Sequence, residues 1–208
     1  GESYNPSEGP NKMYDPWFRK KFTLTEKPYK ATLFVASIGF HEVYVNGKKI
    51  DDHVLPPAVT DHTKRARYIA YEIAPELIKG ENVIALWLGT GWSIFAPYAT
   101  DDKPRAPIAI AQTDIYNEKG EVIERIITDE SWRTHPSPNK WGFGVGGYGG
   151  EIWDANQEIE NWNSVDFNDE DWKSSTILNP SLKLSAQQVE PNRLIDEIQP
   201  VDIEHRSD

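Results

Sequence analysis

Cysteine is absent from the 208-residue sequence, so disulfide bonds, a thiolate nucleophile and a cysteine-ligated metal site are excluded. Hydrophobic runs are short, and none approaches the roughly 20 residues that a transmembrane helix needs. The N-terminal sequence GESYNPSEGP has neither the basic region nor the apolar region of a signal peptide. Basic residues are outnumbered, with 22 Lys and Arg against 33 Asp and Glu. The resulting net charge of −11 repels phosphate backbones and anionic lipids, which disfavours a nucleic-acid or membrane-surface role.

Aromatic residues, by contrast, are abundant, with 8 Trp, 9 Tyr and 7 Phe. A disordered acidic chain is poor in aromatic residues, so this composition indicates a folded protein. A length of 208 residues suits one large domain or two small ones. It is also long enough to bury a hydrophobic core without disulfide bonds.

Short segments of alternating apolar and polar residues, separated by turn residues, make up most of the sequence. This period of two is typical of β-strands, and helical periodicity is hard to find anywhere. Asn46-Gly47, between two such segments, predicts a type I′ hairpin turn. We therefore predict an all-β fold, namely an antiparallel β-sandwich or jelly roll. The expected strands cover residues 17–24, 31–38, 40–45, 48–50, 67–73, 82–88, 108–115 and 122–128.

Composition divides the chain into three predicted parts. Residues 1–13 are expected to be a flexible leader, residues 14–178 the β-sandwich domain, and residues 179–208 a linker or extended tail. Inside the sandwich, residues 89–107 and 135–150 lack regular alternation and are predicted as two long loops. Loops of this length in a compact domain are usually functional or disordered, and their bulky rings argue against disorder.

The sequence lacks the familiar catalytic and metal-binding motifs. Its five His form neither H-x-x-x-H nor H-E-x-x-H, and G-x-S-x-G and the P-loop are absent. Residues 142–147 match G-x-G-x-x-G, but a dinucleotide site needs a strand before this motif and a helix after it. The preceding Pro138 and the following glycines favour a plain glycine-rich loop. Carboxylates are too numerous for the sequence to select a glycosidase pair.

Seven aromatic residues lie in or beside the two predicted loops, together with several carboxylates, amides and an arginine. A sugar presents C–H groups on one face and hydroxyls at its rim, so a Trp or Tyr platform with nearby polar groups suits it. Ordinary core packing is the competing interpretation for each ring taken alone. The seven rings are Trp92, Phe95, Tyr98, Trp141, Phe143, Tyr148 and Trp153.

Several segments, taken in order, resemble one protein family: WFRKKFTL, the run from FVASIGF through DHVLPP to YIAYEI, KGENVIALWLGTGW, TDESWR, YGGEIWDAN and FNDEDW. They resemble the N-terminal β-sandwich of bacterial α-L-rhamnosidases, glycoside hydrolase family 78, also classed as carbohydrate-binding module family 67. The resemblance covers about residues 17–178, and the tail AQQVEPNRLIDEIQPVDI resembles the linker to the next rhamnosidase domain. It implies a jelly roll of the galactose-binding-domain-like type.

The resemblance implies a sugar-binding accessory role rather than catalysis by this chain. The family's catalytic carboxylates lie on a separate (α/α)₆ barrel, so no catalytic residue is carried over. Members that bind sugar hold terminal L-rhamnose with the help of Ca²⁺. The implied carbohydrate-binding residues are Trp92, Tyr98, Tyr148, Glu151, Trp153 and Asp154, and the implied metal ligands are Thr90, Gly149 and Asp154.

Two of these positions depart from the family pattern. Thr90 stands where many relatives have Asp, and Gly149 where many have Asp or Asn, which removes side-chain oxygens that calcium would use. The resemblance leaves a structural alternative, in which the domain only packs against the catalytic domain of the same polypeptide. It also implies a bacterial protein that is secreted or periplasmic, with an L-rhamnose-containing glycan as partner.

Overall fold

The computed structural model describes residues 14–94, 107–142, 150–178, 180, 182–202 and 204. The predicted leader, residues 1–13, lies outside this part of the chain. None of the helices in the described ranges is long and apolar enough to cross a membrane.

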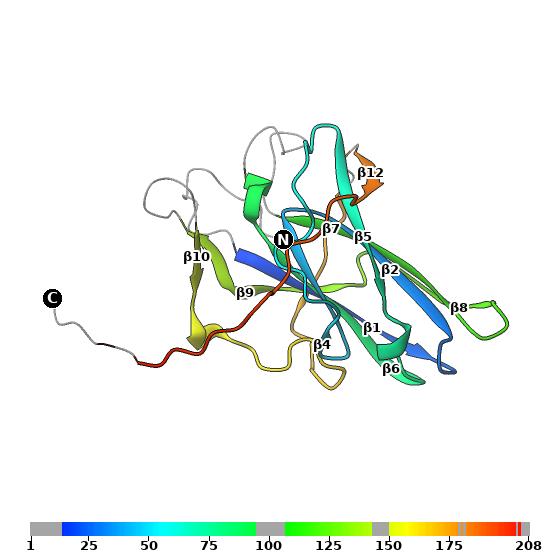
Figure 1. Ribbon diagram of the computed structural model, residues 1–208. Helices are drawn as coiled ribbons and strands as arrows, with labels where there is room; N and C mark the ends of the chain where they lie inside the picture. Colours follow the sequence, from blue (N-terminus) through cyan, green and yellow to red (C-terminus); the bar gives the residue numbers. More distant parts are fainter. Residues whose placement is uncertain are drawn as a thin grey trace.

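The described chain forms two β-sheets packed face to face, as predicted (Figure 1). The seven-stranded sheet has the order β10-β9-β1-β6-β3-β4, with β11 also pairing with β9. Its strands are β1 (Tyr14–Leu24), β3 (Phe40–Val45), β4 (Lys48–Lys49), β6 (Gly80–Gly89), β9 (Arg133–Gly142), β10 (Gly150–Trp153) and β11 (Lys173–Ser174).

The five-stranded sheet has the order β12-β5-β2-β7-β8. Its strands are β2 (Lys30–Ile38), β5 (Arg65–Glu72), β7 (Ile108–Tyr116), β8 (Val122–Ile127) and β12 (Lys183–Ala186). All described strand pairs are antiparallel except β12 with β5. Three short 3-10 helices, η3 (Ala74–Glu76), η4 (Gly91–Ile94) and η5 (Ala155–Gln157), lie between strands.

The hairpin predicted at Asn46-Gly47 joins β3 to β4. Both residues have positive φ, 50° and 87°, as a type I′ turn requires. Asn46 also donates from its side-chain amide to the Glu76 carbonyl at 2.8 Å and to the Asn82 side chain at 3.0 Å. The turn residue therefore fixes the neighbouring loop as well as the hairpin.

The main hydrophobic core lies between the two sheets. In β3 the buried residues His41, Val43 and Val45 alternate with half-buried ones, so the period of two in the sequence corresponds to an inner and an outer face. The largest inward-facing side chains include Leu33, Leu86 and Trp132. This core holds the two sheets together without a disulfide bond.

A second hydrophobic cluster, rich in aromatic residues, covers the outer face of the seven-stranded sheet. Trp17 of β1 stacks on Trp162, with ring centroids 4.6 Å apart, and lies nearly parallel to Trp172 at 6.2 Å. Arg19, two residues along β1, donates to the Phe167 and Ser164 carbonyls at 3.0 and 2.6 Å. Phe167 and Trp172 pack in the same cluster, so the segment between them has a structural role.

One sequence prediction is wrong in part. Residues 135–150 were expected to form a loop, but β9 continues to Gly142 and β10 begins at Gly150. Pro136 and Pro138 lie between the residues of β9 that pair with β11 and those that pair with β10. On that edge a missing N–H breaks no ladder hydrogen bond, so the strand tolerates both prolines.

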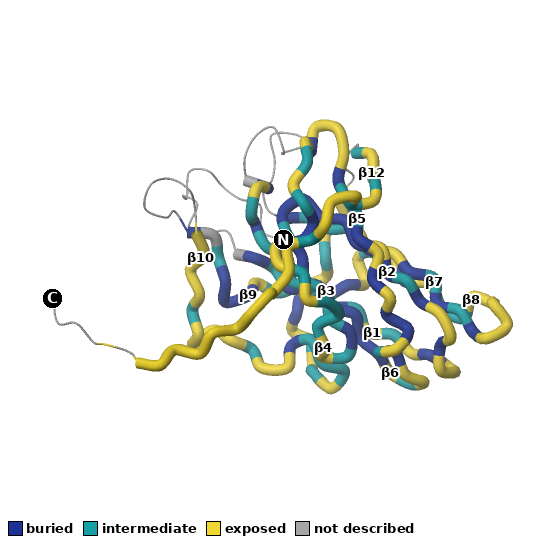
Figure 2. The backbone as a smooth tube through the Cα atoms, in the orientation of Figure 1, coloured by how far each residue is buried: buried dark blue, intermediate teal, exposed yellow. Residues whose placement is uncertain are grey.

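The segment after residue 178, predicted as a linker or tail, contributes β12, which lies parallel to β5 at the edge of the smaller sheet. Later residues follow an extended course and are mostly exposed (Figure 2).

Candidate functional site

The described residues predicted to bind sugar come from two chain segments: η4, which follows β6, and strand β10 with the residue after it. β6 ends at Gly89, and the following η4 carries Trp92. β10 carries Glu151 and Trp153, and Asp154 comes next. Five other residues named from the sequence lie outside the described part of the chain, so their prediction is unchanged; they are Phe95, Tyr98, Phe143, Tyr148 and Gly149.

A line of tryptophans connects the buried cluster to the surface at Trp153. Trp17, which is 1% exposed, contacts Trp87 edge to face with ring centroids 6.2 Å apart. Trp87 in turn contacts Trp153 at 5.7 Å. Trp153 keeps 44% of its surface exposed. The outermost ring is therefore braced from below, which limits the rotamer freedom it would lose on binding a ligand.

Glu151 lies beside this exposed ring. Side chains alternate along a strand, so Glu151 and Trp153 project from the same face of β10, with Ile152 on the other. All three residues are exposed. β10 pairs through Trp153 with Asn139 of β9, in register. The arrangement places an apolar platform and a hydrogen-bond acceptor on one accessible surface.

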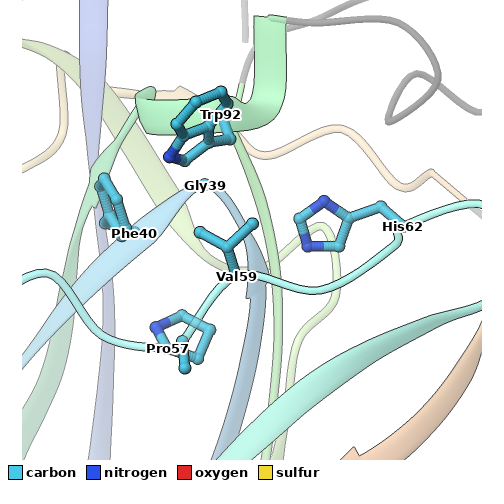
Figure 3. Close-up of a pocket in the computed structure, with 7 residues that line it drawn as sticks. Gly39, Phe40, Pro57, Val59, His62 and Trp92 are labelled. Atoms are coloured by element: carbon cyan, nitrogen blue, oxygen red, sulfur yellow. The ribbon is translucent and has the colours of Figure 1, made fainter.

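Trp92 lies in a different environment, beside a small hollow (Figure 3). Gly91 has φ +46°, and a Cβ there would lie 2.4 Å from the Phe40 ring, so only glycine fits. This close approach sets the chain course into η4. Trp92 is 50% exposed, but the hollow is too narrow to take up a water molecule. A sugar could therefore meet Trp92 only on its open surface; the walls are Gly39, Phe40, Pro57, Ala58, Val59, His62 and Trp92.

A buried carboxylate, missed in the sequence, connects the start of the η4 segment to β9, the strand that pairs with β10. Asp15 of β1 is 1% exposed and accepts two hydrogen bonds at 2.6 Å, from the Thr90 backbone N–H and from the Thr90 hydroxyl. Its other oxygen accepts from the Asn139 amide at 2.7 Å. Burial, with a smaller contribution from the charge of Glu151, raises the pKa of Asp15 to about 6, although the hydrogen bonds from Thr90 and Asn139 favour the ionised form.

No signal in the sequence marks Asp15, because it lies next to the polar leader and belongs to no motif. Its importance comes from pairing between segments far apart in the chain: Asp15 is 75 residues from Thr90 and 124 from Asn139. The cluster holds the start of η4 and the middle of β9 to β1.

The two described residues of the predicted calcium set belong to separate hydrogen-bond clusters. Thr90 is buried and uses its hydroxyl to donate to Asp15. The Asp154 carboxylate caps η5, accepting from the Asn156 backbone and side chain at 3.1 Å and from the Gln157 side chain at 2.7 Å. These hydrogen bonds lower the pKa of Asp154, that from Gln157 most of all.

Calcium needs six to eight oxygen ligands. Within the described ranges no group of three or more His, Asp or Glu is placed to hold a metal ion. Thr90 and Asp154 use their side-chain oxygens in these separate hydrogen-bond clusters, and Gly149 lies outside the described residues. The metal therefore stays a prediction.

Two arrangements among the described residues resemble catalytic pairs, and burial argues against both. Asp15 has a raised pKa near a second carboxylate, as in glycosidases, but its oxygens are inaccessible and already accept hydrogen bonds. The Ser37 hydroxyl lies 2.8 Å from His41 Nδ1, as in a nucleophile–base pair. Both residues are at most 2% exposed, so no substrate reaches them.

Comparison with known proteins finds α-L-rhamnosidases both by sequence and by structure. The α-L-rhamnosidase N-terminal domain family matches residues 26–196. An α-L-rhamnosidase of Formosa agariphila is 28% identical over 200 residues, which cover 92% of this chain and 21% of the relative.

Solved structures give the same picture. An α-L-rhamnosidase from Dictyoglumus thermophilum has a TM-score of 0.79 and 32% identity, covering 97% of this chain and 22% of that one. A Streptomyces avermitilis α-L-rhamnosidase complexed with L-rhamnose has a TM-score of 0.77 and 25% identity, covering 88% of this chain and 18% of that one. The chain thus spans about a fifth of the length of the relatives it matches. Its fold, and a family match over most of its length, show that the chain belongs to the α-L-rhamnosidase N-terminal domain family.

Proposed function

We propose that this chain is a non-catalytic accessory domain of an α-L-rhamnosidase-type glycoside hydrolase, and that it binds a terminal L-rhamnose of a glycan at Trp153. The observation that carries the proposal is the braced tryptophan line, in which Trp153 is exposed while Trp87 and Trp17 support it from below. The family membership of the chain supports the choice of sugar.

The chemistry of the surface suits a pyranose. The apolar face of the sugar would stack on the indole of Trp153, removing C–H groups from water. The Glu151 carboxylate, on the same face of β10, would accept hydrogen bonds from hydroxyls at the sugar rim. A neutral sugar has no charge for the acidic domain to repel, whereas a polyanionic glycan would be disfavoured.

Isothermal titration of L-rhamnose into the 208-residue chain tests this proposal. We expect saturable binding, and the Trp153→Ala variant should weaken it about tenfold or more, because truncating a central aromatic anchor removes most of its contact surface. Tyr29→Ala is the matched control: Tyr29 is also an exposed ring, at 69%, but lies in the turn between β1 and β2.

The outcomes separate the alternatives. Absence of binding at millimolar L-rhamnose would refute sugar recognition and favour the purely structural role. Loss of binding in Trp92→Ala with Trp153→Ala unaffected would move the site to η4. A parallel titration in chelator tests the predicted Ca²⁺: lost binding supports a calcium-dependent site, and unchanged binding refutes it.

A further inference from the structure

The C-terminal part of the chain carries large aliphatic side chains that the domain itself does not cover. Leu194 is 65% exposed, Ile195 96%, Ile198 88% and Val201 103%. Single exposed aliphatic residues are ordinary on a protein surface, but four within eight residues, three of them almost fully exposed, are not. The segment is exposed along its length and projects away from the two sheets (Figures 1 and 2).

This segment leaves the sandwich at a fixed point. Upstream, β12 pairs with β5, and the Gln187 backbone N–H donates to the Tyr68 carbonyl at 2.9 Å. Further along, the Val54 N–H donates to the Asn192 carbonyl at 2.9 Å, and an ion pair joins Arg193 to Asp52. The Leu194 N–H also donates to the Asp52 carbonyl, at 3.3 Å. The chain is therefore anchored as far as Leu194, and the most exposed aliphatic residues, from Ile195 on, begin directly after the anchor.

The exposed residues have a regular spacing and a single sign of charge. Ile195, Ile198 and Val201 are three residues apart, the repeat of an extended polyproline-type backbone, and Pro200 lies among them. Between 195 and 204 the sequence has four carboxylates and neither Lys nor Arg: Asp196, Glu197, Asp202 and Glu204. In such a backbone the three aliphatic side chains would lie along one side of the segment, with the carboxylates on its flanks.

We propose that residues 195–201 form a docking strap, which binds an apolar groove rimmed by Lys and Arg on another domain of the same polypeptide. The stripe needs an apolar surface to remove it from water, and the acidic flanks need basic residues beside that surface. The relatives supply the reason for an intramolecular partner: this chain corresponds to only 21–22% of their length. The proposal goes beyond sugar binding and does not depend on it.

A second copy of this chain is a poorer occupant. Each copy has a net charge of −11, so the acidic flanks of one strap would approach another acidic surface. The outer face of the smaller sheet does expose Ile110, Val122 and Ile127, at 50%, 48% and 46%. These three residues provide a matched control, because they are equally aliphatic and lie on β7 and β8, away from the strap.

Hydrogen exchange of the full-length polypeptide that contains this chain, compared with the 208-residue chain alone, tests the strap. We expect amide exchange across residues 195–202 to be about tenfold or more slower in the full-length protein. The triple variant Ile195→Ser/Ile198→Ser/Val201→Ser should abolish this protection, and 1 M NaCl should weaken it. The control Ile110→Ser/Val122→Ser/Ile127→Ser should keep it.

Equal exchange in both proteins, or protection that survives the strap variant, would overturn the proposal. Sedimentation of the 208-residue chain covers the remaining alternative: a dimer that the strap variant dissociates would identify a second copy as the occupant and also overturn it. The strap variants alter only exposed side chains, so loss of folding does not obscure the result. Sugar titration is a separate readout, and either proposal can fail alone.

Discussion

His41 connects the two sheets through hydrogen bonds inside the core, and it should make the protein sensitive to acid. It lies on β3 of the larger sheet, with Nδ1 2.8 Å from the Ser37 hydroxyl and Nε2 2.9 Å from the Tyr71 hydroxyl, both on strands of the smaller sheet. The side chain is 1% exposed. Burial, with a smaller contribution from the nearby His53, lowers the pKa of His41 from 6.5 to about 3.

The sign and size of the effect follow from linkage. Below pH 6.5 the unfolded chain takes up a proton at His41, while the folded protein does not until about pH 3. Stability is therefore fully present above pH 6.5 and falls as the pH is lowered. At about 1.4 kcal/mol per pH unit, the free energy of unfolding loses about 2 kcal/mol between pH 7 and pH 5 from this residue alone.

Urea unfolding of the native chain and of His41→Gln, each at pH 7 and pH 5, isolates this contribution. Glutamine cannot titrate, so the variant keeps a pH-independent loss from poorer packing but lacks the acid-dependent one. The stability difference between the two proteins should shrink by about 2 kcal/mol from pH 7 to pH 5. A difference that is the same at both pH values would refute the assignment of His41 as a buried neutral group.

Three further changes test other parts of the structure by the same unfolding measurement. Gly39→Ala should destabilise by about 2 kcal/mol or more, because φ is +95° and the added Cβ would lie 2.4 Å from the Gly89 carbonyl oxygen; an unchanged transition contradicts this packing. Arg19→Met should cost about 3 kcal/mol, because it removes the buried guanidinium that donates to the Phe167 and Ser164 carbonyls and lies 3.1 Å from the partly exposed Asp169 carboxylate; a cost below about 1 kcal/mol would contradict this role of Arg19. The pKa of Asp15 is about 6 in the folded protein and 3.8 ordinarily, so deprotonation between these values disfavours folding. As the pH rises from 4 to 7, the native chain should therefore lose up to about 3 kcal/mol of stability relative to Asp15→Asn. A stability difference between the two proteins that does not change with pH would contradict the raised pKa.

The sequence was sufficient to predict the fold class because local pattern and tertiary environment agree. In β3 buried and half-buried residues alternate with the period of two seen in the sequence, and the Asn46-Gly47 turn has the backbone that its residues favour. The resemblance to the rhamnosidase domain is confirmed by the family match over residues 26–196.

The candidate site was less predictable, because its parts meet only through pairing between distant strands. Trp92 and Trp153 were chosen together from the sequence, but Trp153 is braced on Trp87 whereas Trp92 lies beside a separate hollow. Pro136 and Pro138 indicated a loop and instead occupy a strand, since no ladder partner needs their missing N–H groups. The role of Asp15 depends on Thr90, which is 75 residues away.

The proposed strap explains part of the acidity of the chain. Four of its carboxylates lie between residues 195 and 204 beside bare aliphatic side chains, where they favour a basic-rimmed partner surface. The same charges discourage self-association of the isolated domain through this segment.

Fluorine NMR of chain labelled with 5-fluorotryptophan tests the central claim of sugar binding at Trp153 most directly. Single Trp→Phe variants assign the resonances of Trp153, Trp92 and the buried Trp17, which is 1% exposed. On titration with L-rhamnose, the Trp153 resonance should shift saturably, while those of Trp92 and Trp17 stay in place. A spectrum unchanged by L-rhamnose, or a shift confined to Trp92, would contradict the account.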